Sequence, residues 1–365
     1  MRVFRLFTSF ILFDLPLLLV LLLLIAISTT TTNALSSSST TTNSNSNVID
    51  NIHNIKAAVL VPGFLTGAKE FEEMCDILTN EYGIPTVAVP MPNWHWLPCL
   101  GGRSARPMLE RIDCTVQQLI AADGDTTQIG SQLFDYSLSD LWEDFQNNPG
   151  GVMNAGGTNG DVDSYPVVQP RGKFPLPSDT TTTKKKIALI GHSAGGWIAR
   201  AYLSDRNYGG KVYDGKRYIH SLVTLGTPNI DAPGPAFDGI RWVNRDDASS
   251  KVPSLAVGGT GFKGTDWGSL TEGSYTFCSS DGSDGSGFTG DGVTPIQSSL
   301  GLKGADETLE LPGVHHFCWN DVFGGSFVSP ELTKDHREGA PWYGSKQIIP
   351  KWSHFISSRT TSANK

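Results

Sequence analysis

Short apolar runs recur along the chain, and each ends at a glycine, a proline or a polar residue. Runs of four or five branched residues are typical of strands that are buried on both faces of a sheet. Six such runs stand at residues 57–61, 86–89, 187–190, 221–225, 254–258 and 308–311. We predict that these six segments are the strands of one mostly parallel sheet.

Between these strands the apolar positions change to helical spacing. Candidate helices cover residues 68–82, 106–121, 197–203, 237–244 and 347–357, the last despite Pro350. Strands that alternate with helices favour right-handed crossovers and a parallel sheet. We therefore expect an α/β fold with an open, doubly wound sheet and helices on both faces, whose site lies at the carboxyl ends of the strands.

The N-terminal residues 1–34 differ from the rest of the chain. Arg2 and Arg5 precede an apolar run at residues 17–27, which is shorter than the roughly 20 residues of a membrane-spanning helix. This pattern predicts a signal peptide cleaved after Ala34, or an uncleaved signal anchor. We expect entry into the secretory pathway or an endomembrane, while import into a plastid stays an open alternative.

The remaining chain divides by composition. Residues 35–55 form a Ser/Thr/Asn-rich linker, residues 56–357 the folded domain and residues 358–365 a tail. Within the domain, residues 123–185 are rich in Gly, Asn, Asp, Pro and Thr and show almost no periodicity. A loop of that length inside a domain is usually functional or disordered, and we expect a disordered insertion before the strand at residues 187–190.

Composition excludes some partners and cofactors. A net charge of −8 argues against a nucleic-acid partner, and the run Lys184–Lys186 is too small to change that. The five cysteines show no metal-ligand spacing. Their odd number leaves one thiol unpaired even if two disulfides form. The motifs described below imply neither a metal nor an organic cofactor.

The segment at residues 186–196 carries the strongest chemical signal. A buried strand runs into Gly191-His192-Ser193-Ala194-Gly195, and an amphipathic helix follows. This Gly-x-Ser-x-Gly pattern is typical of a nucleophile elbow, in which a strained strand-to-helix turn presents the serine hydroxyl. Ser193 is therefore the candidate nucleophile.

A serine nucleophile needs a base and an acid that orients the base. Two adjacent histidines, His315 and His316, follow the last strand, and only one of them can face Ser193. For the acid we choose Asp291, because its Gly-flanked turn stands one strand before the histidines. Asp231 is the second choice. Other aspartates in comparable loops are Asp266, Asp281 and Asp284, of which the last two suit plain turns.

An oxyanion needs two backbone N–H donors. Ala194 follows the nucleophile and offers one donor, and Phe64, after the glycine that ends the first strand, offers the other. The aromatic segment at residues 94–97 and the helix near Met108 would line an acyl pocket, although they also suit a hydrophobic core.

Several motifs together carry a family resemblance. They are Val61-Pro62-Gly63-Phe64, Gly191 to Gly196, Leu225-Gly226-Thr227-Pro228-Asn229, Gly290 to Pro295 and Gly313-Val314-His315-His316. In order and spacing they resemble lipase-like α/β-hydrolases over about residues 56–357, and most of all the plant and algal proteins grouped with GPI inositol-deacylases. In that family the histidine follows Gly-Val-x, which maps the base onto His316.

The resemblance implies a serine esterase or lipase. Ser193, Asp291 and His316 would be its catalytic triad, with Phe64 and Ala194 in the oxyanion hole and a lipid-like acyl ester as substrate. Contact with a membrane surface stays open. Acyl transfer or thioester hydrolysis would use the same triad, and a hydrolase fold that only binds is an alternative from another class.

Overall fold

The computed structural model describes residues 55–91, 96, 105–129, 187–208, 211–245, 252–265, 269–317 and 341–358. By its internal contacts the chain divides into residues 1–51 and 52–365, and every described residue lies in the second unit. The predicted signal segment, the linker up to residue 54 and most of the predicted insertion lie outside the described residues. In the described part of that insertion, Thr126–Gln128 form a short 3-10 helix.

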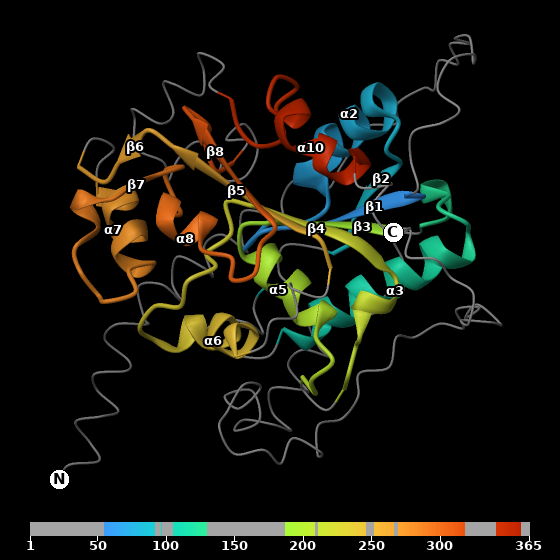
Figure 1. The fold of residues 1–365 in the computed structure, drawn as a ribbon, viewed down its shortest axis with the longest axis horizontal. Helices are drawn as coiled ribbons and strands as arrows, with labels where there is room; N and C mark the ends of the chain where they lie inside the picture. Colours follow the sequence, from blue (N-terminus) through green and yellow to red (C-terminus); the bar gives the residue numbers. More distant parts are fainter. Residues whose placement is uncertain are drawn as a thin grey trace, which may run out of the picture. The chain divides into compact units, whose positions relative to one another are not determined.

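The main sheet consists of the six predicted strands and confirms the expected fold class (Figure 1). Its strands are β1 (Ala57–Val61), β2 (Thr86–Ala88), β3 (Ile187–His192), β4 (Ile219–Leu225), β5 (Ser254–Thr260) and β8 (Glu307–Pro312). They are ordered β2-β1-β3-β4-β5-β8 and all pair in parallel. The chain enters the sheet at β1, the second strand from one edge, and reverses its direction of growth once, between β2 and β3, as in a doubly wound sheet.

The strands are apolar without interruption because both faces of the sheet are covered. Along β1, the side chains of Ala57, Val59 and Val61 belong to one hydrophobic cluster, whereas those of Ala58 and Leu60 belong to another. Successive side chains of a strand point to opposite faces. The two clusters are therefore the cores on the two faces of the sheet.

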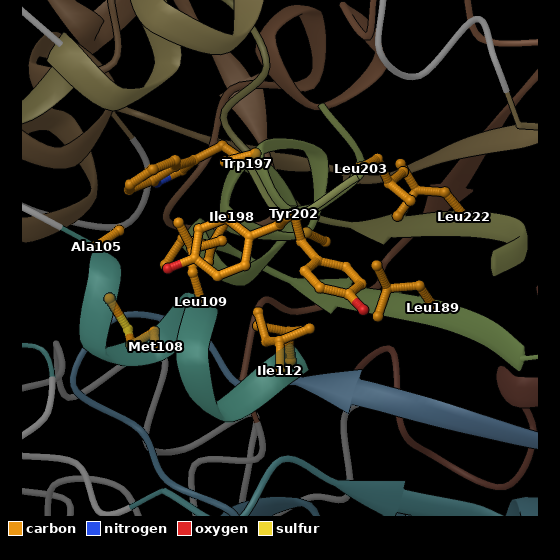
Figure 2. Packing of buried hydrophobic residues seen from close by; sticks show 14 of the residues in the cluster. Ala105, Met108, Leu109, Ile112, Leu189, Trp197, Ile198, Tyr202, Leu203 and Leu222 are labelled. Atoms are coloured by element: carbon orange, nitrogen blue, oxygen red, sulfur yellow. The ribbon is translucent and has the colours of Figure 1, made fainter. Parts of the chain in front are cut away.

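One face is covered by α3 (Arg106–Ala121), α5 (Ala194–Leu203) and α6 (Asp238–Asn244). Figure 2 shows Met108, Leu109 and Ile112 of α3 packed beside Trp197 and Ile198 of α5. All of these side chains are buried, including Met108, which we had considered for a substrate pocket. The bounds predicted for α3 agree with those observed.

The other face is covered by α2 (Glu72–Tyr82) and α10 (Ile349–Ser358). The short 3-10 helix Lys69–Phe71 leads into α2, and α2 ends at Gly83, which has a left-handed φ of 63°. Pro350 is tolerated in α10 because it stands in the first turn, where a backbone N–H has no partner within the helix. The predicted closing helix is therefore present and begins two residues later than expected.

The segment between β5 and β8 contains elements that the periodicity did not predict. A small antiparallel pair is formed by β6 (Phe262–Lys263) and β7 (Thr289–Gly290), with α7 (Ser269–Phe277) between them and α8 (Ile296–Leu300) after them. Asp291 therefore follows a strand of this small pair. Ser193 and His316, in contrast, follow strands of the main sheet.

Two further results concern cysteines and membranes. Cys75, Cys114 and Cys278 are free, buried thiols, and Cys99 and Cys318 lie outside the described residues. Among the helices in the described ranges, none combines the length and apolarity that crossing a bilayer requires.

We expect the α3–α5 contact to contribute strongly to stability. Leu109 is fully buried (0% exposed), so Leu109→Ala leaves a cavity between the helices and lowers the free energy of unfolding by about 2–5 kcal/mol. Urea denaturation followed by circular dichroism measures this change. In the control Val212→Ala, whose side chain is 49% exposed, we expect a change within about 0.5 kcal/mol. Equal effects of the two substitutions would contradict this account of the core.

Candidate active site

Ser193 lies at the sharp turn between β3 and α5. Its backbone has φ 51° and ψ −132°, which is outside the ordinary range of a residue with a side chain. Its N–H donates to the carbonyl oxygen of Leu225 at 2.8 Å, so β4 helps to hold the turn. A Cβ atom on Gly195 would collide with the carbonyl oxygen of Val61, and one on Gly191 would collide with Gly196. The two glycines of the motif are therefore required by close backbone packing.

The turn after β1 lies against this elbow. The N–H and the hydroxyl of Thr66 both reach the carbonyl oxygen of Gly63, at 3.0 and 2.7 Å, which closes a β-turn with Phe64 and Leu65 at its centre. Leu65 has a left-handed φ of 58°. The indole N–H of Trp96 donates to the Thr66 carbonyl oxygen at 3.2 Å. A Cβ on Gly63 would come within 2.8 Å of the Ser193 Cβ, so the turn reaches the nucleophile.

Asp291 is fully buried, yet its carboxylate is surrounded by hydrogen-bond donors. Its Oδ1 accepts from the backbone N–H groups of Val293 and Thr294 at 3.0 and 2.7 Å. Its Oδ2 accepts from the hydroxyl of Tyr343 at 2.7 Å and lies 2.7 Å from Nδ1 of His316. Burial alone would raise the pKa of Asp291, but the His316 imidazole and these hydrogen bonds hold it below its ordinary value.

His316 lies in the loop after β8, and its side chain is fully buried. Since Asp291 is ionised and can only accept, Nδ1 carries the proton and donates. The other ring nitrogen, Nε2, is buried without a hydrogen-bond partner in the described part of the chain. A Cβ on Gly226, next to the residue that holds the Ser193 N–H, would lie 2.9 Å from Nδ1 of His316. The elbow and the Asp–His pair therefore meet at the end of β4.

His192 connects the nucleophile strand to the histidine loop. Its Nε2–H donates to the carbonyl oxygen of His316 at 2.7 Å, and the centroids of the two rings are 4.9 Å apart. The two residues are 124 positions apart in the sequence, so this hydrogen bond joins distant segments of the chain. Burial above all, and the neighbouring His316 next, lower the pKa of His192 from 6.5 to about 3. Its imidazole is therefore neutral near pH 7.

The alternative candidates lie elsewhere. Asp231 is exposed, and Asp266 lies outside the described residues. The carboxylates of Asp281 and Asp284 accept turn N–H groups from Ser283 and Ser286, at 2.9 and 2.8 Å, as plain turn residues do.

His315, the neighbour of His316, has a different environment. Its ring stacks on that of Phe262, with centroids 4.0 Å apart and an interplanar angle of 28°. Its backbone N–H donates to the carbonyl oxygen of Pro341. The ring of His316, in contrast, contacts the carboxylate of Asp291.

Sequence reasoning missed Tyr343. It lies in a loop without periodicity, among Pro341, Trp342 and Gly344, and it gave no signal of its own. Within the described ranges, no cluster of three His, Cys, Asp or Glu side chains is arranged to hold a metal ion.

The comparisons with known proteins agree with this geometry at the level of the class. A family model described as a PGAP1-like alpha/beta domain matches residues 163–242, which include β3, the elbow, α5 and β4. No curated protein sequence gives a significant match. Together with the parallel sheet and the strained serine, the family match over this segment agrees with an α/β-hydrolase fold. The particular closeness to plant and algal members stays a prediction.

Two solved structures are similar at low sequence identity. The product of the gene lin2722 from Listeria innocua is 13% identical, with a TM-score of 0.36; the alignment covers 85% of this chain and 96% of that one. A hyperthermophilic esterase from the archaeon Pyrobaculum calidifontis is also 13% identical, with a TM-score of 0.32, and the alignment covers 83% and 77%.

The low pKa of His192 predicts how stability depends on pH. In the unfolded chain a histidine binds a proton near pH 6.5, whereas folded His192 binds one only near pH 3. The unfolded state therefore takes up protons first as the pH falls, and this single group lowers the free energy of unfolding by about 2 kcal/mol between pH 7 and pH 5.

The substitution His192→Gln tests this linkage, because a glutamine amide can keep the donor to the His316 carbonyl without titrating. We expect its loss of stability between pH 7 and pH 5 to be smaller than that of the wild type by about that amount. Urea denaturation at both pH values measures the difference. The control His354→Gln, at an exposed position on α10, should keep the wild-type dependence. Parallel curves for all three proteins would contradict the interpretation.

Proposed function

We propose that this protein is a serine hydrolase of the lipase and esterase type that cleaves a carboxylic ester. The observation that carries the proposal is the fully buried Asp291–His316 pair at the end of β4, the strand whose Leu225 carbonyl oxygen accepts the N–H of Ser193. Nε2 of His316 has no hydrogen-bond partner within the described ranges. A buried nitrogen without a partner costs free energy, and a serine hydroxyl is the group that would use it. A hydrogen bond from the hydroxyl of Ser193 to Nε2 of His316 is therefore part of this proposal.

In the proposed reaction, Nε2 of His316 takes the proton of the Ser193 hydroxyl while Oγ attacks the ester carbonyl carbon. The tetrahedral intermediate then collapses: the bond to the alcohol oxygen breaks, and His316 gives its proton to the leaving alcohol. Water attacks the acyl-enzyme by the same route, releasing the acid and restoring Ser193. Asp291 stays ionised throughout and stabilises the imidazolium form of His316.

The oxyanion would be held by the backbone N–H groups of Phe64 and Ala194. Ala194 is the first residue of α5, so its N–H has no acceptor within the helix. Phe64 occupies the centre of the turn that touches Ser193, and Leu65 beside it adopts a left-handed conformation. A turn held by Thr66 and Trp96 keeps such a donor in place before the substrate arrives, and this preorganisation is what makes an oxyanion hole effective.

An acyl ester with an apolar chain suits the surroundings of this turn. The side chain of Phe64 is 39% exposed, one of the most exposed large apolar groups of the described chain, and its ring packs edge-on against Trp96 with centroids 5.5 Å apart. An exposed aromatic surface beside an oxyanion donor favours an apolar acyl group. A lipid-like substrate, contact with a membrane surface and entry into the secretory pathway remain parts of the proposal.

Two alternatives share the fold. Acyl transfer and thioester hydrolysis would use the same three side chains, and analysis of the products formed with competing alcohol and thiol acceptors separates them from ester hydrolysis. A non-catalytic binding protein would have no need for a strained serine, and the backbone of Ser193 argues against that reading.

The first test of the function is covalent labelling of Ser193. We expect a fluorophosphonate probe to label the wild-type protein and not Ser193→Ala, because the probe needs an activated hydroxyl. Turnover of p-nitrophenyl esters should fall by about 10⁴-fold or more in this variant. Ser357→Ala, on the last helix, is the control and should keep both activities. A wild-type chain that stays unlabelled would favour the binding-protein alternative.

The adjacent histidines provide the second test. His316→Ala removes the proposed base and should lower kcat/KM for a p-nitrophenyl ester by about 10³-fold or more. His315→Ala removes a ring that stacks on Phe262, and we expect kcat/KM to stay within about tenfold of the wild type. Steady-state kinetics of both variants measures the difference. A larger loss in His315→Ala than in His316→Ala would reverse our choice of the base.

A further inference from the structure

The hydroxyl of Tyr343 occupies a position that the proposed triad does not explain. It lies 2.7 Å from Oδ2 of Asp291, the same oxygen that accepts the Nδ1–H of His316. The backbone N–H of Gly259, the second-to-last residue of β5, donates to the phenol oxygen at 2.6 Å. Because an N–H can only donate, the phenol proton is left to point at the carboxylate.

The ring of Tyr343 is fixed from several sides. It is fully buried, and a Cβ on Gly226 would come within 2.8 Å of its Cε2 atom. The indole N–H of Trp352 on α10 donates to its carbonyl oxygen at 3.0 Å. Burial, and then the charge of Asp291, raise the pKa of Tyr343 well above its ordinary value, so the hydroxyl keeps its proton.

We propose that Tyr343 is a positioning residue that holds Oδ2 of Asp291 against His316 and sets the negative charge that this oxygen offers to the imidazole. This inference rests on the function proposed above and concerns the same site. Tyr343 would act through Asp291 and would not touch the substrate. Its effect should therefore appear in the protonation of His316 and in kcat.

The direction of the effect follows from the shared oxygen. The hydroxyl of Tyr343 draws negative charge away from Oδ2, which weakens the stabilisation of a protonated His316. In Tyr343→Phe that oxygen becomes more negative, so the imidazole keeps its proton to higher pH. The acid limb of kcat/KM should move upward by about half to one pH unit, because that limb reports the base of the free enzyme.

Other titratable groups near Asp291 do not titrate in the pH range of the acid limb of kcat/KM. Besides His316 and Tyr343, the described groups that interact electrostatically with Asp291 include His192 of β3, Tyr275 of α7 and Cys278, which directly follows α7. Burial lowers the pKa of His192 to about 3 and raises that of Cys278 to about 12. Burial also raises the pKa of Tyr275, so these groups keep one protonation state between about pH 4 and pH 9.

Tyr275 provides a matched control. Its hydroxyl accepts from the N–H of Gly292 at 2.9 Å, as Tyr343 accepts from Gly259, but it donates to the carbonyl oxygen of Phe262 at 2.7 Å instead of to a carboxylate. Tyr275→Phe and Tyr343→Phe therefore each leave one buried N–H without its partner. Only Tyr343→Phe also removes a hydrogen bond to the carboxylate of Asp291.

The experiment compares the wild type, Tyr343→Phe and Tyr275→Phe between pH 4 and pH 9, using a p-nitrophenyl ester. We expect Tyr343→Phe to shift the acid limb upward and to lower kcat about tenfold, with KM within about twofold, and Tyr275→Phe to leave the limb in place. Incorporation of 3-fluorotyrosine at position 343 keeps both hydrogen bonds and makes the hydroxyl a stronger donor. It should move the limb to lower pH, and it replaces the phenylalanine variant if that variant does not fold.

A second readout needs no activity. In the full chain labelled with ¹⁵N-histidine, the His316 imidazole, assigned by comparison with His316→Ala, should stay protonated to higher pH in Tyr343→Phe. If the wild type shows neither turnover nor labelling, the proposed function fails while this titration still decides the role of Tyr343. Superimposable titrations of the wild type and Tyr343→Phe, or equal shifts in Tyr275→Phe, would overturn the inference.

Discussion

The hydrogen bond between Nδ1 of His316 and Oδ2 of Asp291 is the interaction on which the site depends. A carboxylate without exposure to water is unfavourable unless its lone pairs are used. Here the backbone of Val293 and Thr294, the imidazole and the hydroxyl of Tyr343 donate four hydrogen bonds to it. Those four donors match the roughly four acceptor positions of a carboxylate. The loops that carry these donors therefore have to meet at the side chain of Asp291. This arrangement also fixes the position of the His316 imidazole.

Most of the fold could be predicted from the sequence because a buried parallel sheet gives a strong local signal. The run Ile187 to Ile190 is apolar at every position, and the helix 106–121 shows a continuous apolar stripe. The segment around α7 gave no such signal, since Gly273 interrupts a short helix rich in polar residues. Short elements of this kind are fixed by tertiary contacts, such as the hydrogen bond from Tyr275 to the Phe262 carbonyl oxygen.

The candidate site was predictable to the extent that it depends on backbone geometry. Strained turns require glycine at fixed offsets, so Gly191 and Gly195 mark the elbow. Tyr343 and the bond from His192 to the His316 carbonyl depend on contacts between distant segments, which leave no pattern in a single sequence. Asp291 did leave a pattern, because its Gly-flanked turn and its place before the histidine loop favoured it over Asp231. The small strand pair that precedes it could not be predicted in the same way.

A buried site with two neighbouring imidazoles has to control where positive charge can form. The rings of His192 and His316 are 4.9 Å apart, and two protonated rings at that distance would repel each other strongly where water is scarce. Only His316 faces a carboxylate, whereas His192 faces the His316 carbonyl oxygen and has a pKa of about 3. His192 can therefore support the His316 backbone as a neutral donor. In the proposed reaction, the proton that leaves Ser193 would then go to His316, because Asp291 stabilises the positive charge that forms there.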